Sequence, residues 1–146
     1  MKIIRFLDEQ GESHYGAQHN DDSVTRIEGC IFSDYTDTGE AATVTKQLAP
    51  VKPATVLCIG LNYRKHAEEG GADIPEHPVL FMKMPSTVQN PGDPILLPTR
   101  LKSDSVDYEC ELAVVIGRDC KNVSKATRSI MCTAIPAPTP SALATG

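Results

Sequence analysis

The apolar residues of this chain come in short runs that end at glycine or proline. Residues 55–60 are almost wholly apolar and close at Gly60, and the run at residues 79–84 is followed directly by Pro85. The longest strand candidate covers residues 107–116 and ends at Gly117. Apolar runs of this kind are typical of β-strands that are buried on both faces. We therefore expect a mixed α+β fold that is mainly β, with short helices.

Turn residues and prolines divide the chain into three predicted parts. Residues 1–50 form a small strand-rich domain, and residues 48–53 contain two prolines that are typical of a linker. A second domain at residues 51–126 contains the long apolar runs and a further strand at residues 95–97. Residues 127–146 form an alanine-, proline- and threonine-rich tail that we expect to be disordered. The strands of the first domain are expected at residues 2–7, 14–17, 24–28 and 42–46.

The charge balance is mildly acidic: the 146 residues include 14 basic and 19 acidic side chains, for a net charge of -5. This balance argues against a nucleic-acid or anionic-membrane surface. No apolar run approaches the ~20 residues of a membrane-spanning helix, and the first residues are not typical of a signal or transit peptide. We expect a cytoplasmic protein, with a mitochondrial location left open. The five cysteines include no Cys-x-x-Cys pair, which favours neither disulfides nor a zinc site.

Two acidic residues, Glu109 and Glu111, interrupt the longest predicted strand. Residues two apart project from the same face of a strand, whereas Cys110 and Leu112 point to the other face. Adjacent carboxylates on an apolar strand repel each other and resist burial, and a divalent cation would relieve both costs. Hard oxygen ligands suit Mg²⁺, Mn²⁺ or Ca²⁺. These two residues alone favour the alternative, a solvent-facing acidic edge of a half-buried strand.

A histidine and a glutamate share one face of a predicted short helix. Asn62 can cap this helix, and within it His66 and Glu69 are three residues apart. The carboxylate could orient the imidazole, which makes His66 a candidate general base; a plain surface pair is the alternative. Lys83 is a lone cation within the apolar run at residues 79–84, where it could anchor an anionic substrate or protect a sheet edge.

Four segments, taken together and in this order, resemble the fumarylacetoacetate hydrolase family. They are G-L-N-Y-R-K-H-A-E-E from Gly60, P-V-L-F-M-K-M-P-S-T from Pro78, P-G-D-P-I-L-L-P from Pro91 and V-D-Y-E-C-E-L-A-V-V-I-G from Val106. They are similar to the N-terminal half of that family's catalytic domain, a fumarylacetoacetase-type β-roll. Residues 1–50 resemble the small N-terminal domain of many members.

The resemblance implies a role for each candidate residue. Glu109 and Glu111 would be two of three carboxylate ligands of a Mg²⁺ or Mn²⁺ ion. His66, paired with Glu69, would act as general base, and Lys83 would contact the substrate. Family members are metal-dependent hydrolases, lyases or tautomerases of small 2-oxo or 1,3-dicarbonyl acids, such as acylpyruvates, fumarylacetoacetate and oxaloacetate. They are commonly dimers, so the resemblance also implies a homodimer.

The end of the chain departs from the family pattern. The third ligand is an aspartate in a segment that this sequence lacks, and in its place Pro136, Pro138 and Pro140 alternate with alanine and threonine. Read one nucleotide out of frame from Thr127, the degenerate codons permit a family-like segment, although not its ligand aspartate. We interpret the chain as a truncated copy with a frame-shifted tail and an impaired metal site. The alternatives are a non-catalytic remnant that serves as a dimerisation or binding module and a calcium-binding domain.

Overall fold

Nine strands, one α-helix and two 3₁₀ turns make up the described part of the chain, residues 1–106, 108–109 and 111–133 of a computed structural model. They divide into two compact units. The first unit contains Met1–Val51 together with the described residues from Gln89 onward, and the second unit is Lys52–Val88. The predicted fold class, mainly β with short helices, is confirmed.

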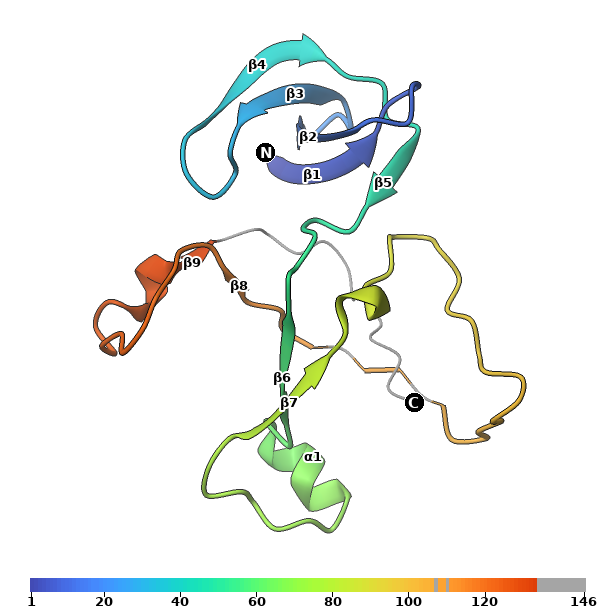
Figure 1. The fold of residues 1–146 in the computed structure, drawn as a ribbon, viewed down its shortest axis with the longest axis vertical. Helices are drawn as coiled ribbons and strands as arrows, with labels where there is room; N and C mark the ends of the chain where they lie inside the picture. Colours follow the sequence, from blue (N-terminus) through green and yellow to red (C-terminus); the bar gives the residue numbers. More distant parts are fainter. Residues whose placement is uncertain (107, 110, 134–146) are drawn as a thin grey trace. The chain divides into compact units, whose positions relative to one another are not determined.

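Five antiparallel strands form a curved sheet in the first unit, in the order β4-β3-β2-β1-β5 (Figure 1). The strands predicted at residues 2–7 and 14–17 are confirmed as the hairpin of β1 and β2, with Ile4 opposite Gly16 and Phe6 opposite His14. The five strands are β1 (Lys2–Leu7), β2 (Ser13–Gln18), β3 (Val24–Gly29), β4 (Tyr35–Ala41) and β5 (Lys46–Leu48).

The strand predicted at residues 42–46 is wrong, because this segment crosses from one side of the sheet to the other. The amide of Ala42 donates to the carbonyl oxygen of Val24 on β3, whereas the amide of Thr45 donates to the carbonyl oxygen of Leu7 on β1. The segment therefore joins β4 to β5 and pairs with neither neighbour along its length.

Two apolar clusters cover the two faces of this sheet. Ile4, Phe6 and Val24 form one cluster, and a second one contains Ala17 and Ile27. Because side chains alternate along a strand, the pairing of Ile4 with Gly16 and of Ile3 with Ala17 places the clusters on opposite faces. Phe6 is the one large side chain of the described residues that is completely buried. The first unit thus holds most of the core.

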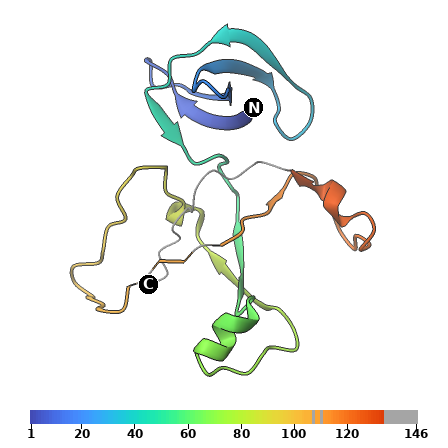
Figure 2. The same ribbon diagram turned by 180° about the vertical axis from the view of Figure 1, so that it is seen from behind.

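The second unit contains a two-stranded antiparallel sheet of β6 (Val56–Gly60) and β7 (Val79–Lys83), which confirms the two predicted strands. The helix α1 (Arg64–Glu69) lies in the connection between them (Figure 2), and the 3₁₀ turn η1 (Pro85–Thr87) follows β7. Asn62 does not cap α1 as predicted, because the extended N-cap residue is Tyr63 and no side chain caps the helix.

Most of the strand predicted at residues 107–116 does not form. Only Val115–Ile116 is a strand (β8), and its partner is β9 (Cys132–Thr133) after the 3₁₀ turn η2 (Arg128–Met131). A strand needs a neighbour for its backbone hydrogen bonds, and residues 108–109 and 111–114 have none among the described residues. The strand expected at residues 95–97 is absent for the same reason.

The tail predicted to be disordered has regular structure over its first residues. Residues 128–133 form η2 and β9, and β9 forms because Cys132 and Thr133 pair with β8. The rest of that prediction, together with Asp107 and Cys110, lies outside the described residues.

Many apolar side chains outside the N-terminal sheet remain exposed. Leu57 on β6 is 61% exposed and Met82 on β7 is 72% exposed. The prediction that these strands are buried on both faces is therefore wrong, since no second layer covers them among the described residues of their unit. No helix in the described part of the chain is long and apolar enough to span a membrane.

Candidate active site

His66 and Glu69 both lie on α1, and both side chains are exposed. Their spacing of three residues places them on one face of the helix, but no hydrogen bond or ion pair joins them here. His66 sits in the last turn of α1. The helix thus presents both side chains to solvent.

Lys83 is the last residue of β7 and is half-buried. Its Nζ lies 5.9 Å from the centre of the Phe81 ring, which contributes a cation–π contact. Lys83 pairs with Val56 at the start of β6, whereas α1 follows Gly60 at the other end of that strand. Four residues of extended chain span ~13 Å. The second unit therefore places Lys83 and α1 at opposite ends of the β6–β7 pair.

Glu109 and Glu111 lie in the irregular segment that precedes β8. Glu109 is half-buried and Glu111 is exposed. Because these residues are not part of a strand, the expected alternation of side chains does not fix which way they point. Within the described residues, no cluster of three or more His, Cys, Asp or Glu side chains forms a metal site.

The candidate residues divide between the two compact units. His66, Glu69 and Lys83 belong to the second unit, and Glu109 and Glu111 belong to the first. The structure therefore describes the surroundings of each group within its own unit, and the five residues together remain a predicted site.

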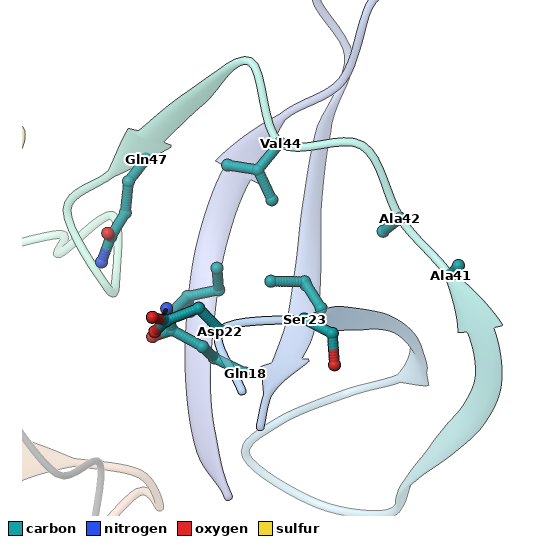
Figure 3. A pocket seen from close by; sticks show the side chains of 9 residues that line it. Gln18, Asp22, Ser23, Ala41, Ala42, Val44 and Gln47 are labelled. Carbon is teal, nitrogen blue, oxygen red and sulfur yellow. Dashed lines mark hydrogen bonds between the residues drawn. The ribbon is translucent and has the colours of Figure 1, made fainter. Parts of the chain in front are cut away.

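A cavity of about 330 Å³ lies beside the N-terminal sheet (Figure 3). Its polar lining comes from Gln18, Asp22, Ser23 and Gln47, and its apolar lining includes Val44. No residue of the predicted site lines this cavity.

The N-terminal sheet holds a polar cluster that the sequence analysis missed. Asp8, in the turn after β1, contacts His14 on β2 and Arg26 on β3. Partial burial opposes ionisation of Asp8, but hydrogen bonds from the Glu12 amide, the His14 ring and the Gln10 amide outweigh it and lower its pKa. Only the hairpin register, which brings residues six apart together, could have indicated this cluster.

Comparison with known proteins adds two family matches. Residues 55–135 match the family model described as fumarylacetoacetate (FAA) hydrolase C-terminal, and residues 1–52 match the model described as Rv2993c-like, N-terminal. The first match alone covers more than half of the chain and includes all five candidate residues.

Individual relatives show the same pattern. The fumarylacetoacetate hydrolase domain-containing protein 2 homolog of Dictyostelium discoideum is 48% identical over 77 residues, which are 53% of this chain and 25% of that protein. The mitochondrial oxaloacetate tautomerase of Rattus norvegicus is 46% identical over 81 residues, 55% of this chain and 25% of that protein.

A crystal structure of 2-hydroxyhepta-2,4-diene-1,7-dioate isomerase from Mycobacterium marinum has a TM-score of 0.69 and 28% identity, over 90% of this chain and 50% of that one. The chain thus spans about a quarter of the length of these curated relatives and half of the solved structure.

Proposed function

Since the chain belongs to the fumarylacetoacetate hydrolase family, we propose that it carries catalytic residues for a divalent-metal-dependent reaction of small 2-oxo or 1,3-dicarbonyl acids. The observation that carries this proposal is that the family match spans His66, Glu69, Lys83, Glu109 and Glu111 together. The relatives support the substrate class, because one is named as an oxaloacetate tautomerase and another as an isomerase of a dienedioate.

Glu109 and Glu111 are the residues that would hold the metal ion. Their carboxylates are hard oxygen ligands, and Mg²⁺ is often bound by only one or two carboxylates with water in its other positions. The donor chemistry therefore fits Mg²⁺ or Mn²⁺, and Ca²⁺ as a third choice, although two ligands predict weak affinity. A bound divalent cation supplies a Lewis acid that polarises a carbonyl group.

His66 would take a proton from the substrate carbon next to the carbonyl, or from water. Glu69, on the same face of α1, would orient the ring and stabilise its charged form. Lys83 would pair its ammonium group with a substrate carboxylate, because a half-buried cation is a strong anion partner. Hydrolysis, decarboxylation and tautomerisation of such acids all pass through enolate-like charge. These roles therefore suit each of the three reaction types.

Metal titration and turnover of the full chain test the proposal. We expect calorimetry to detect Mg²⁺ binding that Glu109→Gln and Glu111→Gln remove, with Glu76→Gln as the matched exposed control. We expect His66→Ala to abolish turnover of oxaloacetate enol or an acylpyruvate and to leave Mg²⁺ binding unchanged. His77→Ala, a second exposed histidine, should keep both. A folded chain with neither metal affinity nor turnover would overturn the proposal.

The exposed apolar side chains of β6 and β7 favour a second candidate function, a dimerisation or binding module. Leu80 is 61% exposed and Met82 is 72% exposed, which leaves apolar area available for a partner chain. Sedimentation analysis separates the two candidates, because association without turnover supports the module and turnover supports the enzyme.

A further inference from the structure

A polar network joins edge strand β5 to the turn of residues 89–93. Lys46 Nζ lies 2.8 Å from both Oδ1 and Oδ2 of Asp93. Asn90 Nδ2 donates to Asp93 Oδ2 over 2.9 Å, and Asn90 Oδ1 accepts the backbone amide of Ala49 over 3.0 Å. The amide side chain of Asn90 thus contacts both the turn and the strand end.

The same network satisfies both backbone groups of the buried residue Ala49. Its amide donates to Asn90, and its carbonyl oxygen accepts a 3.0 Å hydrogen bond from Arg5 Nη1 on β1. A buried backbone group without a partner costs free energy comparable to a lost hydrogen bond. Asn90 therefore occupies the place that a further strand would take beside the end of β5.

Two further hydrogen bonds involve residues of the turn. The amide of Asp93 donates to the carbonyl oxygen of Asn90 over 3.1 Å, and Gln89 Nε2 donates to the carbonyl oxygen of Pro94 over 3.1 Å. The bond between Asp93 and Asn90 closes the turn and allows both side chains to face β5, whereas the bond of Gln89 runs to Pro94 beyond the turn.

The partners of this network come from two different family matches. Arg5, Lys46 and Ala49 lie within residues 1–52, whereas Asn90 and Asp93 lie within residues 55–135. The first compact unit likewise combines Met1–Val51 with the chain from Gln89 onward. The N-terminal domain is therefore fastened to a segment that follows β7, about forty residues beyond the linker.

We propose that the turn of residues 89–93 is an interdomain clip, which docks the chain leading toward Glu109 on the edge of the N-terminal sheet. The clip works through Asn90, which replaces a missing strand neighbour, and through the Lys46–Asp93 ion pair, which holds the turn in place. The N-terminal domain thus supports the part of the second family domain that follows β7. This proposal does not depend on the proposed enzymatic function.

Amide hydrogen exchange of the full chain, resolved by NMR, tests the clip. Asn90→Ala should speed exchange of the Ala49 amide about fivefold, the equivalent of one ordinary hydrogen bond. Asp93→Asn and Lys46→Met should speed it by a smaller factor, because they loosen the turn and leave Asn90 in place. Gln89→Ala is the matched control, since it removes a hydrogen bond to Pro94, outside the turn of residues 89–93, and should leave the Ala49 amide unchanged.

A double-mutant cycle supplies the second measurement. Lys46→Met and Asp93→Asn should shift the unfolding midpoint less together than the sum of their separate shifts, because both break the same pair. The exposed pair Lys125→Met and Asp104→Asn should be additive. The proposal is overturned if exchange of the Ala49 amide is unchanged in Asn90→Ala, or if Gln89→Ala speeds it as much as Asn90→Ala does. It is also overturned if the midpoint shifts of Lys46→Met and Asp93→Asn are additive.

Discussion

The ring of His14 and the carboxylate of Asp8 are joined across the β1–β2 hairpin by a 2.7 Å contact between Nε2 and Oδ2. Arg26 Nη1 lies 3.3 Å from the other ring nitrogen, Nδ1. Because arginine can only donate, Nδ1 is the acceptor and Nε2–H is the donor to Asp8. The imidazole therefore links the anion on one side to the cation on the other.

This arrangement predicts a loss of stability in acid. The pKa of Asp8 in the folded chain lies below its ordinary value, so its carboxylate stabilises the fold at every pH above the unfolded value. That contribution is lost as the pH falls through the folded pKa. Asp8→Asn should therefore lower the urea midpoint at neutral pH and flatten its fall in acid. Asp34→Asn, an exposed control, should keep the wild-type acid profile, and an unchanged profile in Asp8→Asn would contradict the assignment.

Gly16 is required by the close approach of the core to β2. A Cβ atom at this position would lie 2.5 Å from Val24 Cγ1 and 3.0 Å from Phe6 Cε1. Gly16→Ala should therefore lower the free energy of unfolding by ~1–3 kcal/mol, the usual cost of overpacking a core. At Gly60, also in a strand, the nearest atom is 3.5 Å away, so Gly60→Ala should be nearly neutral. Urea titration of both variants measures the difference.

The local pattern predicted two kinds of strand. The β1–β2 hairpin follows from alternation beside a turn rich in Gly and Asp, and β6 and β7 follow from short apolar runs that end at Gly or Pro. Strand β4, Y-T-D-T-G-E-A, has almost no apolar residues, and it forms because β3 offers a free edge. Residues 107–116 have the stronger apolar signal, yet without a neighbouring strand most of that segment stays irregular. Strand formation depends on partners that the local sequence does not contain.

The candidate site remains a prediction, and its geometry does not follow from the sequence. His66, Glu69, Lys83, Glu109 and Glu111 were chosen from motif resemblance, and the family match includes all five. Their arrangement depends on how β6, β7 and the segment before β8 are paired, which no local pattern specifies. The Asp8–His14 contact was missed for the same reason, because it depends on the register of a hairpin.

Cys30 is predicted to be more reactive than its sequence context indicates. Hydrogen bonds from the Phe32 amide and the Ser33 hydroxyl lower the pKa of this exposed thiol. The thiolate is the reactive form, so iodoacetamide should label Cys30 faster than the half-buried Cys58 at neutral pH. Ser33→Ala should slow labelling of Cys30 and leave Cys58 unchanged. Mass spectrometry of timed samples gives both labelling rates. Equal labelling rates of Cys30 in the wild-type protein and in Ser33→Ala would contradict this account.

One face of the β6–β7 pair should tolerate polar substitution without loss of stability. Leu57 pairs with Met82 and Ile59 pairs with Leu80, so these four exposed side chains share a face. The double variant Leu80→Thr/Met82→Thr keeps good strand formers and removes apolar area. This double variant should bind less of a hydrophobic dye and should self-associate less than the wild-type protein. Its unfolding midpoint should be unchanged. Ala67→Thr, which alters a completely buried position on α1, should lower the midpoint instead. If the unfolding midpoint falls as far in the Leu80→Thr/Met82→Thr variant as in Ala67→Thr, this face of the β6–β7 pair is covered in solution.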